Sequence, residues 1–150
     1  MSLELALEGI SKVLLDTAPV VYYLEGHPDY APLMDRFMAV QVERPIVCVT
    51  SPITLSECLI LPLRRGDISL SDAHRQVLTA GEGVEFHPLG TREADLAASL
   101  RANYNLTLTD AYQSAMAIVT GCQAVLSNDR VFTRVREIRT LILDDLKELL

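Results

Sequence analysis

Cysteine and histidine are scarce in the sequence and follow no disulfide or metal-binding pattern. The three cysteines are Cys48, Cys58 and Cys122. Their number is odd, no two have C-x-x-C spacing, and each lies in an apolar stretch, which indicates buried free thiols in a cytoplasmic protein. The three histidines are His27, His74 and His87. They are far apart and lack the spacing of a zinc site, so we expect each to be a surface or packing residue.

The sequence also lacks any long apolar run and has few positive charges. No segment approaches the roughly 18 unbroken apolar residues of a membrane span, and residues 1–10 lack the basic region that begins a signal peptide. With 20 acidic and 13 basic residues the net charge is −7, which argues against non-specific nucleic-acid binding through a basic surface. Only Lys12 and Lys147 are lysines. The remaining bases are arginines, which suit paired contacts with phosphate or carboxylate groups, although genome composition also explains such a bias.

The size and apolar content of the sequence are those of one domain. Its 150 residues are 49% hydrophobic, which is enough for a full core and leaves apolar residues to cover a partner surface. We expect a single domain over residues 1–150, in which residues 1–11 form an N-terminal extension and residues 144–150 form an acidic C-terminal tail.

Short apolar strands and amphipathic helices alternate along the chain. The predicted strands cover residues 12–16, 46–49, 84–87, 124–126 and 141–143. The predicted helices cover residues 17–26, 32–43, 52–62, 67–80, 91–103 and 110–120. Because the strands are apolar on both faces and helices separate them, we expect a three-layer α/β/α domain with a central parallel sheet of about five short strands.

Four acidic residues occupy positions that one edge of such a sheet brings together. Asp16 closes the first strand and Asp129 follows the fourth, while Glu57 and Asp110 lie in helices that begin at the same edge. Each aspartate also has a simpler explanation. Asp16 and Asp129 suit turns or helix caps, and Asp110 suits a helix N-terminus, where the macrodipole favours a negative charge. The set as a whole predicts a site at the carboxyl edge of the sheet.

Glu57 is the hardest of the four to explain as an ordinary surface residue. Its neighbours one helical turn away are Ile53, Thr54, Ile60 and Leu61. A glutamate on so apolar a helix face is expected to be buried, and a buried carboxylate needs a cation as partner. The partner is either a metal ion or an arginine such as Arg64 or Arg65.

Four carboxylates in one cleft cannot all stay ionised without a cation between them. A ligand set made only of oxygen atoms suits Mg²⁺ or Mn²⁺. We therefore expect Asp16, Glu57, Asp110 and Asp129 to form a metal site. Arginines at 130, 134, 136 and 139 form a possible rim for a phosphate-containing substrate, or simply a solvated surface.

The ordered motifs resemble the PIN-domain family, and most of all its VapC-type toxin ribonucleases. The motifs are LLDT at 14–17, TLSE at 54–57, LTDA at 108–111 and LSNDRVF at 126–132. The resemblance implies a metal-dependent ribonuclease that uses Mg²⁺ or Mn²⁺, acts on RNA, forms a homodimer and is held by a VapB-like antitoxin. Its four acids match Asp16, Glu57, Asp110 and Asp129. The polar positions before the last acid match Ser127 and Asn128, which are expected to contact a metal-bound group or a phosphate.

Two features depart from the family pattern, and two other functions stay open. The stretch before the first strand is longer than usual, and Pro19 is a variant of the following helix start. One alternative is another Mg-carboxylate phosphohydrolase or receiver, but Asp16 has no adjacent acid and neither lysine falls where a receiver needs it. The other is a PIN-like module that binds protein or RNA without turnover.

Overall fold

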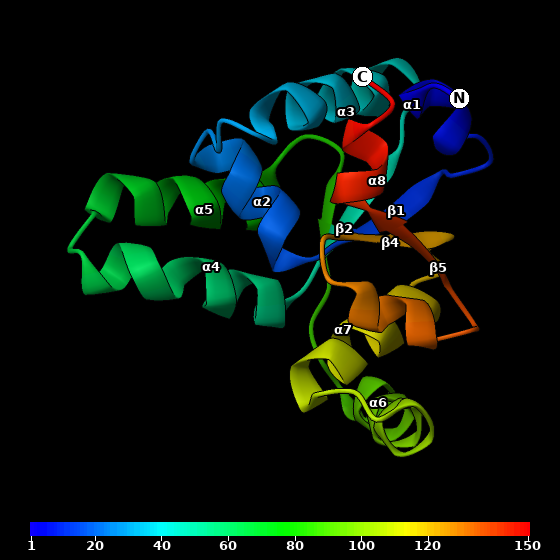
Figure 1. Cartoon of the computed structure of the whole chain (residues 1–150). Coiled ribbons are helices and arrows are strands. Elements are labelled where there is room, and N and C mark those ends of the chain that lie inside the picture. The colour runs from blue at the N-terminus through cyan, green and yellow to red at the C-terminus, as the bar shows by residue number, and fades with distance from the viewer.

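The computed structural model describes all residues 1–150 and has a five-stranded sheet at its centre (Figure 1). The strands are β1 (Lys12–Leu15), β2 (Val47–Thr50), β3 (Val84–Phe86), β4 (Ala124–Ser127) and β5 (Arg139–Ile142). All neighbouring strands are parallel, in the order β3-β2-β1-β4-β5. The predicted parallel sheet of five short strands is therefore confirmed.

Eight α-helices and one short 3₁₀ helix surround the sheet. They are α1 (Leu3–Ala6), α2 (Thr17–Leu24), α3 (Ala31–Glu43), α4 (Pro52–Arg64), α5 (Ile68–Ala80), α6 (Thr91–Tyr104), α7 (Leu108–Val119), η1 (Arg130–Arg134) and α8 (Leu143–Lys147). One core contains residues of α1, α2, α3, α4, α5 and α8, and the second contains residues of α6, α7 and η1. This is the expected three-layer arrangement, with α6, α7 and η1 on one side of the sheet in Figure 1. No helix combines the length and apolar character needed to cross a membrane.

The strand order places a topological switch point beside β1. From β1 the chain adds β2 and β3 on one side, then crosses to add β4 and β5 on the other. Leu15 at the end of β1 lies in register with Leu126 of β4, and the amide of Asp16 donates to the Leu126 carbonyl at 3.0 Å. Ligands of open α/β sheets bind at such a point, outside the carboxyl ends of the strands.

Local sequence explains where the helices that approach this edge begin. Ser51 caps α4 by accepting from the Thr54 amide at 3.3 Å, and Pro52 occupies the first helical position, where no amide donor is needed. Thr107 caps α7 by accepting from the Asp110 amide at 3.2 Å. Helix α7 therefore begins at Leu108, two residues before the predicted start.

The end of the last strand differs from the prediction. Residues 141–143 were expected to be extended, but β5 starts at Arg139 and ends at Ile142, and Leu143 is the first residue of α8. Leu143 is fully buried in the first core. An apolar side chain at this point fits a strand or a helix equally well, so the periodicity alone does not separate the two.

His74 of α5 is a packing residue, as expected. Its side chain is 0% exposed, neither ring nitrogen has a hydrogen-bond partner, and Nε2 lies 3.7 Å from Oε2 of Glu25. Burial lowers the pKa of His74, and the neighbouring Glu25 opposes that shift. His74 thus packs between helices mainly as a neutral imidazole.

We expect His74 to make the fold less stable in mild acid. Because its pKa in the folded protein is below the unfolded value, its contribution is complete above pH of about 6.5 and is lost as the pH falls through the folded pKa. Urea unfolding at a series of pH values, compared between wild type and His74→Phe, measures this. The difference in stability between the two proteins should change steadily with falling pH. A constant difference would contradict the assignment.

Candidate active site

Asp16 lies at the switch point with a half-buried carboxylate. It precedes α2 at the N-cap position, but its side chain makes no capping hydrogen bond. Its Oδ2 instead accepts from Ser127 Oγ at 2.7 Å. Burial raises the pKa of Asp16, the hydrogen bond from Ser127 opposes this, and the charge of Asp110 adds to the rise. The capping explanation therefore does not account for this side chain.

Ser127 connects Asp16 to Asp129. The Ser127 side chain is fully buried at the end of β4, and its Oγ also accepts from the Asp129 amide at 3.0 Å. Asp129 itself is exposed, and its Oδ1 caps η1 by accepting from the Val131 amide at 2.9 Å. Ser127 was predicted to contact a ligand or phosphate. In the structure its hydroxyl holds one acid directly and positions the backbone of the other.

Glu57 is exposed, so the prediction of a buried glutamate was wrong. Two of its apolar neighbours on α4, Ile60 and Leu61, are 48% and 43% exposed, whereas Thr54, one turn before Glu57, is buried, so this helix face leaves the core at Glu57. No arginine pairs with Glu57; its Oε1 accepts from Thr17 Oγ1 at 3.2 Å. Partial burial raises the pKa of its carboxyl, and so do the charges of Asp16 and, less strongly, Asp110.

Asp110 completes a group of three acids. It lies half-buried in the first turn of α7, and its Oδ2 accepts from Thr107 Oγ1 at 2.7 Å. The Asp110 charge raises the pKa of both Asp16 and Glu57. These three side chains are thus close enough to repel one another, whereas Asp129 is joined to them through Ser127.

The three acids offer the donors that a hard divalent cation prefers, but they do not enclose one as they stand. No group of three or more acidic, histidine or cysteine side chains is close enough to hold a metal ion. Two of the carboxylates instead accept from threonines, Glu57 from Thr17 and Asp110 from Thr107. Oxygen donors that carry mutually repelling charges fit Mg²⁺ or Mn²⁺, which would take the place of these threonine contacts.

Asn128 and the expected arginine rim have other partners. The Asn128 amide donates to the Tyr30 hydroxyl at 3.0 Å, and its Oδ1 accepts from the Asp144 amide at 3.0 Å. These bonds tie the end of β4 to the starts of α3 and α8. Three arginines are similarly engaged: Arg130 with Asp145, Arg134 with the Asn105 carbonyl and Arg139 with the Ala6 carbonyl. Among the four rim arginines, only Arg136 has a side chain without such a partner.

The sequence reasoning missed a buried polar group behind the acids. Gln113 Nε2 donates to Thr54 Oγ1 at 2.6 Å, and Gln113 Oε1 accepts from Ser51 Oγ at 2.6 Å. All three side chains are at most 1% exposed. A usable signal existed, because Gln113 and Thr54 are polar residues within apolar helices, one turn from Asp110 and Glu57 respectively.

Replacing Ser127 with alanine is expected to reduce the activity of the site. The change removes the hydroxyl that holds Asp16 and the Asp129 backbone. Loss of a group that orients a metal ligand typically costs about 10- to 100-fold in metal affinity or activity. Ser127→Thr keeps the hydroxyl and is the matched control. The rise in Tm on addition of Mn²⁺ should be smaller for the alanine variant only, and equal losses in both variants would contradict the role of the hydroxyl.

The fold and the site together define a class of protein: a parallel α/β domain with acidic side chains converging at its switch point. The sequence model of the PIN domain matches residues 13–138, and the chain belongs to the PIN domain family. No curated protein sequence matches it closely enough to count as a relative.

Solved structures of toxin–antitoxin proteins have the same fold. VapBC2 of Rickettsia felis, solved on a fragment of promoter DNA, superposes with a TM-score of 0.70 at 15% identity, over 87% of this chain and 98% of that one. VapC20 of Mycobacterium tuberculosis, described as a sarcin-ricin loop cleaving toxin, has a TM-score of 0.67 at 18% identity, over 81% of this chain and 92% of that one. DNA-bound VapBC of Salmonella typhimurium has a TM-score of 0.63 at 21% identity, over 88% of this chain and 98% of that one.

Proposed function

We propose that this chain is a metal-dependent endoribonuclease and the toxin of a type II toxin–antitoxin pair. The observation that carries the proposal is the group of Asp16, Glu57 and Asp110 at the switch point: the charge of Asp110 raises the pKa of Asp16, and the charges of Asp16 and Asp110 raise the pKa of Glu57. Membership of the PIN domain family and the VapC-like fold support the same activity. Ser127, the last residue of β4, donates a hydrogen bond to Asp16 and accepts one from the backbone amide of Asp129, which follows β4.

The residues have distinct roles in the proposed hydrolysis. Asp16 and Asp110 would hold Mg²⁺ or Mn²⁺, with Asp129 as a further ligand or support, and the cation would lower the pKa of a water and polarise the phosphate. Glu57 orients the water and accepts its proton, which its raised pKa favours. The water oxygen bonds to phosphorus and the bond from phosphorus to the 3′ oxygen breaks. The 3′ oxygen takes up a proton, which leaves a 5′-phosphate and a 3′-hydroxyl.

Cleavage of RNA by the purified chain tests this activity. Wild-type protein should cut a structured RNA in the presence of Mg²⁺ or Mn²⁺ and stop when EDTA is added. The products should carry a 5′-phosphate, which 5′-phosphate-dependent exonuclease digestion detects. Absence of cleavage on a broad RNA set, with normal folding, would favour a PIN-like binding module instead.

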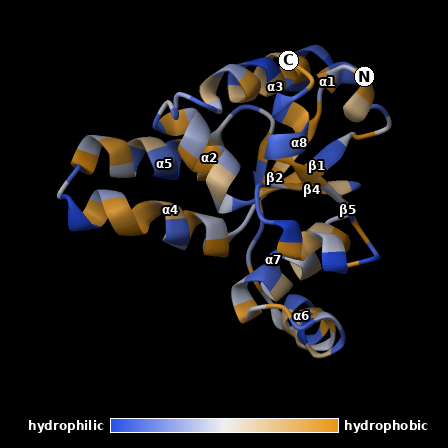
Figure 2. Cartoon of the chain, viewed as in Figure 1, coloured by the Kyte–Doolittle hydropathy of each residue, from blue (hydrophilic) through white to orange (hydrophobic).

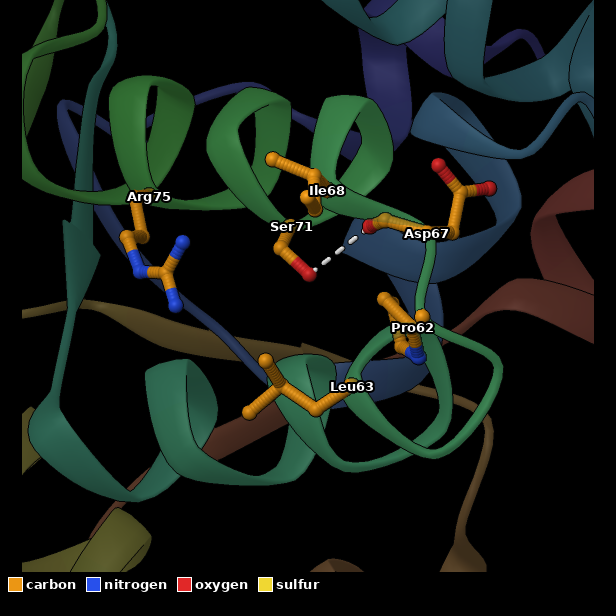
Figure 3. A pocket seen from close by; sticks show the side chains of 7 residues that line it. Pro62, Leu63, Asp67, Ile68, Ser71 and Arg75 are labelled. Carbon is orange, nitrogen blue, oxygen red and sulfur yellow. Dashed lines mark hydrogen bonds between the residues drawn. The ribbon is translucent and has the colours of Figure 1, made fainter.

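An apolar surface on α4 and α5 suits the antitoxin. Leu63 and Ile68 are 58% and 75% exposed, and much of α4 is hydrophobic in Figure 2. Both residues line a pocket of about 190 Å³ between the two helices, with Pro62 and Arg75 (Figure 3). Two of the fold relatives above were solved as VapBC complexes. We therefore place a VapB-like segment on this surface. We also expect the chain to act as a homodimer, as the resemblance to VapC-type toxins implies.

Leu63→Glu tests the antitoxin surface. A charge in this pocket should weaken the complex with the product of an adjacent small gene, because the apolar contact is lost. The exposed residue Arg92 of α6 lies on the opposite layer, and Arg92→Glu is the control. Co-purification and growth rescue on co-expression measure the effect. Equal binding by both variants would place the antitoxin elsewhere.

A further inference from the structure

Gln113 is a buried amide with both ends of its side chain engaged. It lies in α7, 1% exposed, and its donor and acceptor each have a partner at 2.6 Å, Thr54 Oγ1 and Ser51 Oγ. A buried amide is costly unless it is hydrogen-bonded, and the two hydroxyls satisfy the side chain of Gln113. Both hydroxyls belong to the start of α4. The side chain of Gln113 therefore ties α7 to α4.

The same chain of hydrogen bonds reaches the end of β1. Thr54 Oγ1 accepts from Gln113 and donates to the Leu15 carbonyl at 3.2 Å. Leu15 is the last residue of β1 and directly precedes Asp16. Three elements that are far apart in the sequence, β1, α4 and α7, thus meet at a single threonine hydroxyl.

This contact lies close to three acids at once. Asp110 is three residues before Gln113 on α7, and Glu57 is three residues after Thr54 on α4, so each acid shares a helix face with the contact. Asp16 follows the carbonyl that Thr54 binds. A small shift of α7 relative to α4 would change the distances among all three carboxylates.

The three carboxylates near this contact carry like charges. Their charges act at the edge where α4 and α7 approach, and like charges at short range push these helices apart. Hydrogen bonds between neutral groups in a dry environment resist that displacement without adding charge.

We propose that Gln113 is a positioning residue that sets the spacing of Asp16, Glu57 and Asp110 for cation binding. It acts through its hydrogen bonds to Thr54 and Ser51, and its amide also lies close enough to the Asp16 carboxylate to lower the pKa of that group. The inference rests on the proposed function, because it assigns Gln113 to the same metal site. It goes beyond that function by making the separation of the acids depend on one side chain of α7.

Mn²⁺ binding by variants of the contact tests the proposal. Gln113→Leu keeps most of the side-chain volume and removes both hydrogen bonds, and Thr54→Val removes the shared hydroxyl from the opposite helix. Ser114→Ala is the matched control, because the Ser114 hydroxyl is equally buried on α7 and has no partner. Circular dichroism first establishes that each protein is folded. Titration calorimetry with Mn²⁺ alone then measures the affinity of each folded protein for the cation. RNA cleavage is measured in parallel.

Gln113→Leu and Thr54→Val should each weaken Mn²⁺ binding by about 10- to 100-fold, and Ser114→Ala should leave it unchanged. The loss in the double variant should be less than the sum of the two single losses, because both changes remove the Gln113–Thr54 hydrogen bond. Wild-type affinity in Gln113→Leu, or fully additive losses in the double variant, would overturn the proposal. If Gln113→Leu does not fold, wild-type affinity in Thr54→Val overturns it. Absence of Mn²⁺ binding by the wild type would overturn both the role of Gln113 and the proposed function. Normal Mn²⁺ binding by the wild type together with unchanged binding by the variants would overturn only the role of Gln113.

Discussion

Asp16→Asn is expected to lower the rate of RNA cleavage by about a thousandfold. The proposed function makes Asp16 a direct ligand, and loss of metal-ion stabilisation of the transition state costs several kcal/mol. The amide keeps an oxygen that accepts from Ser127, so the local hydrogen bond survives while the charge is lost. Initial rates under saturating Mn²⁺ measure the effect, and Asp110→Asn should behave in the same way.

The same substitution is expected to stabilise the metal-free protein. Burial raises the pKa of Asp16 above its ordinary value, so the ionised side chain opposes folding at neutral pH. The gain in Asp16→Asn should therefore be present at neutral pH and should vanish in acid, where Asp16 of the wild type is already protonated. An activity loss combined with a higher Tm is the pattern of a strained functional site.

Asp35→Asn is the control for both measurements. Asp35 is an exposed acid on α3 that makes no ion pair or side-chain hydrogen bond. Its substitution changes the net charge equally and should alter neither the cleavage rate nor the pH dependence of stability. Cleavage by Asp16→Asn at more than a tenth of the wild-type rate would rule Asp16 out as a ligand.

Phe132→Ala is expected to cost about 3–5 kcal/mol in the free energy of unfolding, as buried phenylalanines usually do. Phe132 is 0% exposed and packs in the second core with Leu14 of β1 and Val125 of β4. For a domain of this size the loss corresponds to a fall in Tm of roughly 6–20 °C. Urea unfolding monitored by circular dichroism measures it.

Phe132 also anchors the segment that follows the last acid. It lies in η1, which Asp129 caps, so loss of the ring should loosen η1 and the position of Asp129. Cleavage should therefore fall further than the unfolded fraction explains. The neighbouring Val131 is only partly buried, and Val131→Ala should cost clearly less stability. Similar losses for the two variants would show that Phe132 is not the anchor.

Much of the fold follows from local sequence patterns. Short strands that are apolar on both faces, separated by helices, require a covered parallel sheet, and the motifs place Asp16 and Asp129 directly after strands of that sheet. That these two strands are neighbours is seen only in the structure. Asp16 lies directly after β1, where the sequence placed it, and its carboxylate is not used as a helix cap.

The environment of each side chain was less predictable, because it depends on which helix faces meet. Apolar neighbours made Glu57 look buried, yet that face of α4 is exposed beside α5, with Ile60 and Leu61 toward solvent. The arginines after Asp129 looked free on the sequence, but three of them bind acidic side chains or carbonyls from distant segments. Such partners lie far away along the chain and leave no periodic signal.

The sequence by itself determined the sheet, the order of the elements and the acidic residues that reach its carboxyl edge, because strand and helix periods and the positions that follow strands are local properties. Only the tertiary structure decided which acids repel one another and what holds them. Ser127 reaches Asp16 because β4 pairs with β1, and Gln113 reaches Thr54 because α7 packs beside α4. Both contacts join residues more than 50 positions apart, so they arise from packing of the whole chain and from no segment of it.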